Sequence, residues 1–114
     1  MGEVLIRSET PADHAAIRTV NEQAFGQQAE ATLVDALREA GDLLLSLVAV
    51  DEESDAVVGH IAFSRVKIIA DGKQVAGVSL APMAVLPSHQ RQGIGTKLVR
   101  EGLRLCAERG EKIV

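Results

Sequence analysis

The sequence predicts one α/β (α+β) domain, residues 1–114, with the element order β-α-α-β-β-β-α-(β). Three observations support this prediction. The chain has 114 residues, which suits a single small domain. Apolar residues recur at helical spacing in three segments, and β-rich aliphatic runs fill much of the remainder. Glycine, proline and aspartate mark the boundaries between these segments. We expect a mixed, mostly antiparallel sheet, because only the last helix can cross over to a parallel strand.

The N-terminal part is expected to form a strand and two helices. Residues Glu3–Glu9 place the apolar run Val4–Ile6 between charged side chains, and Pro11 favours a helix start directly after them. Helices are predicted from Asp13 to Phe25 and from Glu30 to Ala40, each followed by a glycine that can end it. The residues expected to face inward are Ala16, Ile17, Val20, Ala24, Leu33, Val34 and Leu37.

Three strands should follow, at Leu43–Val50, Val57–Ile69 and Gln74–Leu86. The first turn between them contains four acidic residues, for which a solvated hairpin tip is favoured over an amine-attracting patch: Asp51, Glu52, Glu53 and Asp55. Pro82 interrupts the third strand. Because proline cannot donate a ladder hydrogen bond, we expect an edge, a bulge or the end of pairing there.

A last helix is predicted from Gly93 to Arg109, and Glu111–Val114 resembles the start of a further strand. The residues that this helix should bury are Leu98, Val99, Gly102, Leu105 and Cys106. Cys106 is the single cysteine, so no intramolecular disulfide can form. It is expected to pack as a small apolar residue.

Composition excludes several classes of function. The formal net charge is −4, whereas nucleic acids and anionic membranes select surfaces rich in Lys and Arg. We therefore expect no nucleic-acid and no membrane partner. The sequence shows no signal peptide and no membrane-spanning run, which predicts a cytoplasmic protein. No metal site is predicted.

The segment most informative for function lies between a predicted strand and a predicted helix. It consists of Gln90, Arg91, Gln92, Gly93, Ile94, Gly95 and Thr96. The first N–H groups of a helix have no intrahelical partner, and the helix dipole favours an anion there. Glycines at 93 and 95 would let phosphate oxygens approach these N–H groups, and Arg91 adds positive charge.

Two better-known phosphate loops do not fit this segment. The dinucleotide fingerprint G-x-G-x-x-G would need a small residue at Leu98. The Walker A loop needs Gly-Lys-Ser/Thr, whereas the order here is Gly95, Thr96, Lys97. The remaining alternative is that the two glycines only shape a strand-to-helix turn.

The segment Gln90–Gly95 resembles the Q/R-x-x-G-x-G/A pattern of the GNAT acetyltransferases. The preceding residues Ala84–His89 are similar to a common lead-in of that superfamily, and Val58–Ser64 resembles the third strand of bacterial predicted N-acetyltransferases. The element order also resembles the GNAT-like acyl-CoA N-acyltransferase fold. The resemblance covers nearly the whole chain.

This resemblance implies acetyl-CoA as co-substrate and direct attack on it by a primary amine, in a ternary complex and without a covalent acyl-enzyme. Backbone N–H groups from Arg91 to Thr96 would hold the coenzyme's pyrophosphate. Met83, Ala84 and Val85 would offer a strand edge to the pantetheine arm. The Val85 amide would stabilise the oxyanion of the tetrahedral intermediate.

The sequence departs from the family pattern at the groups that transfer protons. Many members place a glutamate near the start of the fourth strand, but Gly77–Leu80 contains no carboxylate, and the chain has no tyrosine to act as acid. His60 and His89 remain candidate bases by their chemistry, although structural or solvated roles are favoured. No catalytic residue is assigned, and the amine acceptor is left open.

Members of this superfamily continue with a fifth strand, another helix and a final hairpin, so we expect the sequence to stop before the C-terminal part of the fold. An open sheet edge would follow, and association into a homodimer through that edge is a hypothesis. Two alternative functions remain. One is a non-catalytic acyl-CoA-binding module, and the other is a structural fragment without an acceptor site.

Overall fold

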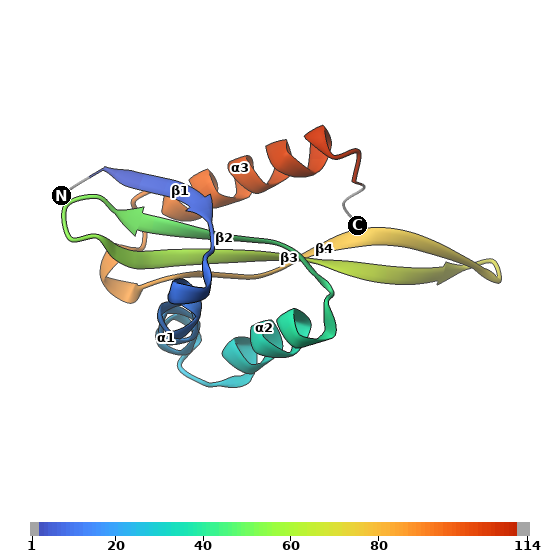
Figure 1. Ribbon diagram of the computed structural model, residues 1–114, viewed down its shortest axis with the longest axis horizontal. Coiled ribbons are helices and arrows are strands. Elements are labelled where there is room, and N and C mark those ends of the chain that lie inside the picture. The colour runs from blue at the N-terminus through green and yellow to red at the C-terminus, as the bar shows by residue number, and fades with distance from the viewer. Residues whose placement is uncertain (1–2, 112–114) are drawn as a thin grey trace.

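A computed structural model describes residues 3–111 of the chain, and its elements follow the predicted order (Figure 1). Two short 3-10 turns, Pro11–Asp13 and Pro87–His89, precede the first and last helices. The strands and helices are β1 (Val4–Ser8), α1 (His14–Phe25), α2 (Ala29–Ala40), β2 (Leu43–Asp51), β3 (Ala56–Ala70), β4 (Lys73–Val85) and α3 (Ile94–Glu108). The predicted α/β class is confirmed, with boundaries within two residues of those expected. The strand predicted at 111–114 lies almost wholly outside the described residues.

The four described strands form one antiparallel sheet in the order β1-β2-β3-β4. Helices α1 and α2 cover one face of the sheet and α3 covers the other (Figure 1). Consecutive strands are neighbours because each is joined to the next by a turn or by the helical pair, which places β1 and β4 at the two edges. The edge formed by β4 is the one that leads directly into α3.

The core is aliphatic on both faces of the sheet, as expected of a chain with two aromatic residues. The cluster under α3 is the larger one and consists of Leu45, Leu47, Ala49, Val58, Ile61, Phe63, Val78, Ile94, Leu98 and Cys106. The cluster under α1 and α2 consists of Ile17, Val34, Val48 and Val50. Both helical layers are therefore held to the sheet by apolar contacts.

The inward position predicted for Leu33 is wrong. Its side chain is 46% exposed, whereas Ala31 and Val34 are buried. A helix turns about 100° per residue, so the arc that faces the sheet admits residues three apart and excludes Leu33 between them. The inward predictions are confirmed for Ile17, Val20 and Val34, which are buried, whereas the remaining three residues are half-buried: Ala16, Ala24 and Leu37.

Helix α3 approaches the sheet closely at Gly102. A Cβ atom at this position would overlap the ring of Phe63 on β3. One turn further on, Cys106 is 1% exposed and packs in the same cluster, which confirms that it behaves as a small apolar residue. Burial raises the pKa of the Cys106 thiol.

The outer halves of β3 and β4 extend beyond the rest of the molecule as a two-stranded arm, on the right in Figure 1. Ile68, Ile69 and Val75 on this arm are exposed. Nearer the body, the pairing shifts between Ile61 and Phe63, opposite Pro82. The predicted irregularity at Pro82 is confirmed, and it lies on an edge strand.

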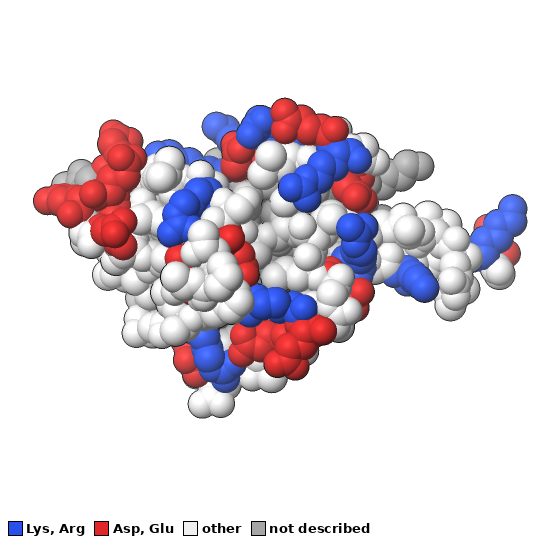
Figure 2. Space-filling view, viewed as in Figure 1, with Lys and Arg blue, Asp and Glu red and all other residues white. Residues whose placement is uncertain are grey.

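Acidic side chains gather over the turn between β2 and β3, at the left end of Figure 2. Glu52, Glu53 and Asp55 are exposed there, as a solvated hairpin tip requires. Within residues 3–111, none of the helices combines the length and the apolar character that crossing a membrane would require.

Candidate functional site

The connection from β4 to α3 forms a loop that opens at the start of the helix. The N–H of Leu86 donates to the Val58 carbonyl at 2.9 Å and ends the sheet pairing. After the turn Pro87–His89, Arg91 and Gly93 both adopt left-handed backbone conformations, with φ of +66° and +82°. A left-handed residue reverses the chain direction locally, so α3 can start directly beside the end of β4.

The first turn of α3 presents unpaired backbone donors. The N–H of Lys97 makes the first helical hydrogen bond, to the Gly93 carbonyl at 3.1 Å. The N–H groups of Ile94, Gly95 and Thr96 therefore have no carbonyl one turn earlier to bind. Gly93 is the N-cap and has no side chain that could accept from them. This end of the helix is suited to an anion.

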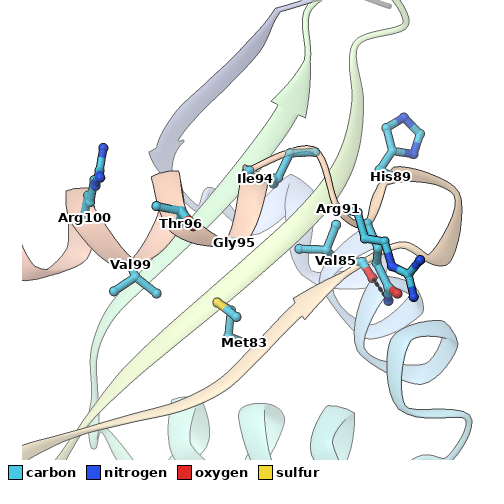
Figure 3. Close-up of a pocket in the computed structure, with 11 residues that line it drawn as sticks. Met83, Val85, His89, Arg91, Ile94, Gly95, Thr96, Val99 and Arg100 are labelled. Carbon is cyan, nitrogen blue, oxygen red and sulfur yellow. Dashed lines mark hydrogen bonds between the residues drawn. The ribbon is translucent and has the colours of Figure 1, made fainter.

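A pocket of about 550 Å³ lies between this helix start and β4 (Figure 3). Two β4 residues form one wall, and the loop and the first two turns of α3 form the other. The lining residues are Met83, Val85, His89, Gln90, Arg91, Gly93, Ile94, Gly95, Thr96, Val99 and Arg100.

Eight of the ten residues predicted to bind the coenzyme line this pocket, and two do not. Ala84 is 2% exposed and faces the opposite side of the sheet, where it pairs with His60. Gln92 is exposed at the outer bend of the loop but does not line the pocket. The side chains of neighbouring strand residues point to opposite faces of a sheet, so Ala84 lies on the other face from Met83 and Val85 and does not line the pocket.

Sequence reasoning missed Val99 and Arg100 as lining residues. The signal that would have found them is helical spacing from Thr96, because residues three and four positions further on lie on the same face of α3. His89 was considered only as a base, and the structure places it at the mouth of the pocket.

The edge of β4 beside the pocket offers backbone groups to a ligand. Leu86 directs its N–H toward β3, so in an antiparallel ladder the N–H and C=O groups of Val85 and Met83 point away from β3. Consistent with this direction, the Val85 carbonyl accepts a hydrogen bond from Gln90 Nε2 at 3.0 Å. The open edge and the helix start thus flank one pocket.

Positive charge and a histidine surround the mouth of the pocket. Arg91 and Arg100 are exposed side chains on its rim. His89 Nε2 lies 3.5 Å from Asp51 Oδ2, and the Ser88 hydroxyl contacts His89 Nδ1 at 2.8 Å. Hydrogen bonding from the backbone N–H of Glu53 lowers the pKa of Asp51, so this carboxylate stays charged beside the imidazole.

His60 lies on the far side of the sheet and does not line the pocket. It is fully buried, with Asn21 Nδ2 at 3.2 Å from Nδ1 and Ser46 Oγ at 2.8 Å from Nε2. Burial lowers the pKa of His60 to about 4. These contacts favour a structural role for His60. No carboxylate among the described residues lines the pocket, so the pocket offers no carboxylate as a candidate base instead.

Comparisons with known proteins agree with this geometry. Residues 11–114 match the acetyltransferase (GNAT) family. The N-acetyltransferase YhbS of Escherichia coli K12 is 42% identical over 107 residues, which cover 94% of this chain and 62% of YhbS. YjhQ of the same strain, also an N-acetyltransferase by name, is 35% identical over 92 residues, which cover 81% of this chain and 51% of YjhQ.

Two solved structures are similar to the whole described fold. A GNAT family acetyltransferase from Brucella melitensis, in complex with acetyl-CoA, is 43% identical with a TM-score of 0.85, over 97% of this chain and 73% of that one. E. coli YhbS in complex with CoA is 40% identical with a TM-score of 0.86, over 97% of this chain and 60% of that one.

The present chain spans about three-fifths of the length of YhbS. The family match nevertheless covers nearly all of the chain, including the pocket and both elements that form it. The chain belongs to the GNAT family of acetyltransferases.

Proposed function

We propose that the protein containing this chain transfers an acetyl group from acetyl-CoA to a primary amine by direct attack in a ternary complex, and that the segments 83–85 and 90–96 bind the coenzyme. The observation that carries the proposal is the pocket between the open edge of β4 and the start of α3. The CoA and acetyl-CoA complexes of the two similar structures support it.

The start of α3 would bind the pyrophosphate. Its unpaired N–H groups at Ile94, Gly95 and Thr96 converge on one region, and the helix dipole adds positive potential there. Arg91 on the rim supplies a full positive charge. Because Gly93 has no Cβ, phosphate oxygens can approach the backbone without a steric barrier.

The edge of β4 would bind the pantetheine arm. The outward N–H and C=O groups of Met83 and Val85 can pair with the amides of pantetheine as a neighbouring strand would. The Val85 amide remains our candidate for the oxyanion donor. The Met83 amide has the same direction, and both lie within one pocket. Such a donor stabilises the charge that develops on the thioester oxygen.

Direct attack also requires that the amine lose a proton and that the leaving thiolate gain one. Among the described residues that line the pocket, His89 is the only histidine, and none is a carboxylate. Its ring points away from Met83 (Figure 3), and its Nε2 lies 3.5 Å from Asp51 Oδ2 at the end of β2. This position favours a role of His89 in holding the loop. The base and the acid are not assigned.

The test combines binding with turnover. Titration calorimetry with CoA should show that Arg91→Glu weakens binding by about tenfold or more, because it places a carboxylate beside the phosphates. Arg109→Glu, with the same change in charge at the other end of α3, should bind as the unchanged protein does. Equal affinities of both variants would contradict the proposed site.

Turnover separates an enzyme from a binding module. An acetyltransferase releases free CoA thiol when acetyl-CoA is mixed with a panel of primary amines, and a thiol reagent detects this release. Binding of acetyl-CoA without thiol release, in the longest gene product that contains this chain, would instead establish a non-catalytic acyl-CoA-binding module.

A further inference from the structure

Two arginines line the pocket, and they belong to different elements. Arg91 lies in the loop before α3, and Arg100 lies in the second turn of α3. In Figure 3, the Val99 side chain extends from α3 toward Met83 on β4, whereas the Arg100 side chain extends away from β4. The pocket is therefore positively charged in two places, at the loop and on the side of α3 that faces away from the strand edge.

No neighbouring carboxylate neutralises the charge of Arg100. The residues three or four positions away, which share its face of the helix, are not acidic: Thr96, Lys97, Leu103 and Arg104. Arg104 itself contacts Glu101 and lies 3.0 Å from Glu108. Within residues 3–111, Arg100 takes part in no ion pair. Its exposed guanidinium is thus available to an anionic ligand.

CoA carries two separate anionic groups, the pyrophosphate and the 3′-phosphate on its adenosine ribose. Under the proposed function, the start of α3 and Arg91 bind the pyrophosphate. Only the ribose and its 5′ carbon separate the two groups, so the 3′-phosphate has to lie close to the helix start. Arg100 follows Thr96 by four residues, which is about 6 Å along the helix axis. The long side chain of Arg100 can therefore reach a phosphate in this region.

The direction in which Arg100 extends also suits the nucleotide. The pantetheine arm and the nucleotide are attached to opposite ends of the pyrophosphate. Because the pantetheine arm is assigned to the edge of β4, the nucleotide is expected on the side away from β4, where Arg100 extends (Figure 3). The other basic side chains that line the pocket are Arg91, which is assigned to the pyrophosphate, and His89, which lies beside Asp51. Arg100 is the lining cation that remains.

We propose that Arg100 binds the 3′-phosphate of the coenzyme and makes the site selective for CoA over dephospho-CoA, which lacks this phosphate. A guanidinium can donate two parallel N–H hydrogen bonds to phosphate oxygens, which a point charge cannot do. The inference rests on the proposed function, because it uses the same pocket. It goes beyond that function by assigning recognition of a phosphate that takes no part in acetyl transfer to one side chain.

The selectivity should disappear when the guanidinium is removed. The unchanged protein should bind CoA about fivefold or more tightly than dephospho-CoA, as expected of a charge-assisted contact that stays open to solvent. In Arg100→Gln, the ratio of the two dissociation constants should fall to about one. The fold should persist, because Arg100 is exposed on the surface of α3 and glutamine also favours a helix.

Ionic strength gives a second readout, which a merely structural role of Arg100 would not change. Salt screens charges that are exposed to solvent. Raising the salt concentration from about 0.05 M to about 0.5 M should therefore lower the ratio in the unchanged protein. In Arg100→Gln, the ratio should stay near one at both salt concentrations.

The experiment is a set of calorimetric dissociation constants for CoA and dephospho-CoA. Arg104→Gln is the matched control, because it removes the same charge one turn further along α3 from a residue that does not line the pocket. A ratio that is lost in Arg100→Gln and kept in Arg104→Gln supports the inference. Equal weakening of both ligands in Arg100→Gln, or equal binding of both by the unchanged protein, overturns the inference alone. Failure of both ligands to bind the unchanged protein overturns the proposed function as well.

Discussion

At the scale of single residues, the backbone conformation of the loop before α3 could be predicted in part from the sequence. Glycine at 93 indicated a backbone that other residues avoid, and the structure gives it φ of +82°. The left-handed conformation of Arg91 was not predictable, because non-glycine residues adopt it only where their surroundings require it. Ala84 was included in the site as part of the strand edge offered to pantetheine, although the alternation of an antiparallel ladder turns its backbone groups toward β3.

His60 makes a testable contribution to the pH dependence of stability. Its pKa is about 4 in the folded protein and about 6.5 when unfolded, so the unfolded state binds more protons between these values. Stability should therefore rise with pH from 4 to 6.5. Urea unfolding should show that the stability advantage of the unchanged protein over His60→Gln shrinks by about 2 to 3 kcal/mol from pH 7 to pH 4.5.

The comparison with His60→Gln isolates this histidine, because the acidic groups that also titrate at low pH are common to both proteins. An advantage over His60→Gln that stays constant across the pH range would contradict the buried, neutral state of His60.

At the scale of elements, periodicity and turn residues predicted every described helix and strand, because apolar spacing and glycine stops agree along this chain. Which side of each helix touches the sheet was less certain, as Leu33 shows. Its side chain lies just outside the narrow arc of α2 that faces the sheet. Pair contacts such as that of Gly102 with Phe63 join segments far apart in the sequence, and no local pattern reveals them.

The packing of α3 on the sheet should depend on the absence of a side chain at Gly102. Gly102→Ala would force a Cβ into the Phe63 ring, and overpacking of this kind costs about 1 to 3 kcal/mol. Thermal or urea unfolding measures the loss. Lys97→Ala, an exposed change on the same helix, should leave stability nearly unchanged. Equal stability of the two variants would show that α3 does not lie this close to β3.

At the scale of the whole molecule, the order of the elements and the largely antiparallel sheet were predicted from the sequence, but the shape was not. The structure extends 50 × 29 × 25 Å because the outer halves of β3 and β4 project as an arm. Strand length alone cannot tell whether a hairpin packs on the body or extends beyond it. The pocket could not be predicted from single elements either, because it forms only where the end of β4 lies beside the start of α3.

Association into a homodimer remains a prediction at this scale. The arm exposes Ile69, which is 72% accessible, and the edge of β4 runs alongside it. We expect this chain to associate at high concentration in sedimentation velocity experiments, and Ile69→Lys to weaken the association by placing charge on the arm. A monomer at all concentrations would contradict the hypothesis.

The central claim, that the end of β4 and the start of α3 together bind the coenzyme, is tested most directly by backbone amide NMR shifts during titration with acetyl-CoA. AMP and desulfo-CoA serve as comparison ligands. The account predicts that the shifts concentrate at residues 83–85 and 91–97. It also predicts that AMP, which lacks pantetheine, does not reproduce those at 83–85. The absence of any shift in these segments at millimolar acetyl-CoA, or shifts concentrated elsewhere in the chain, would contradict it.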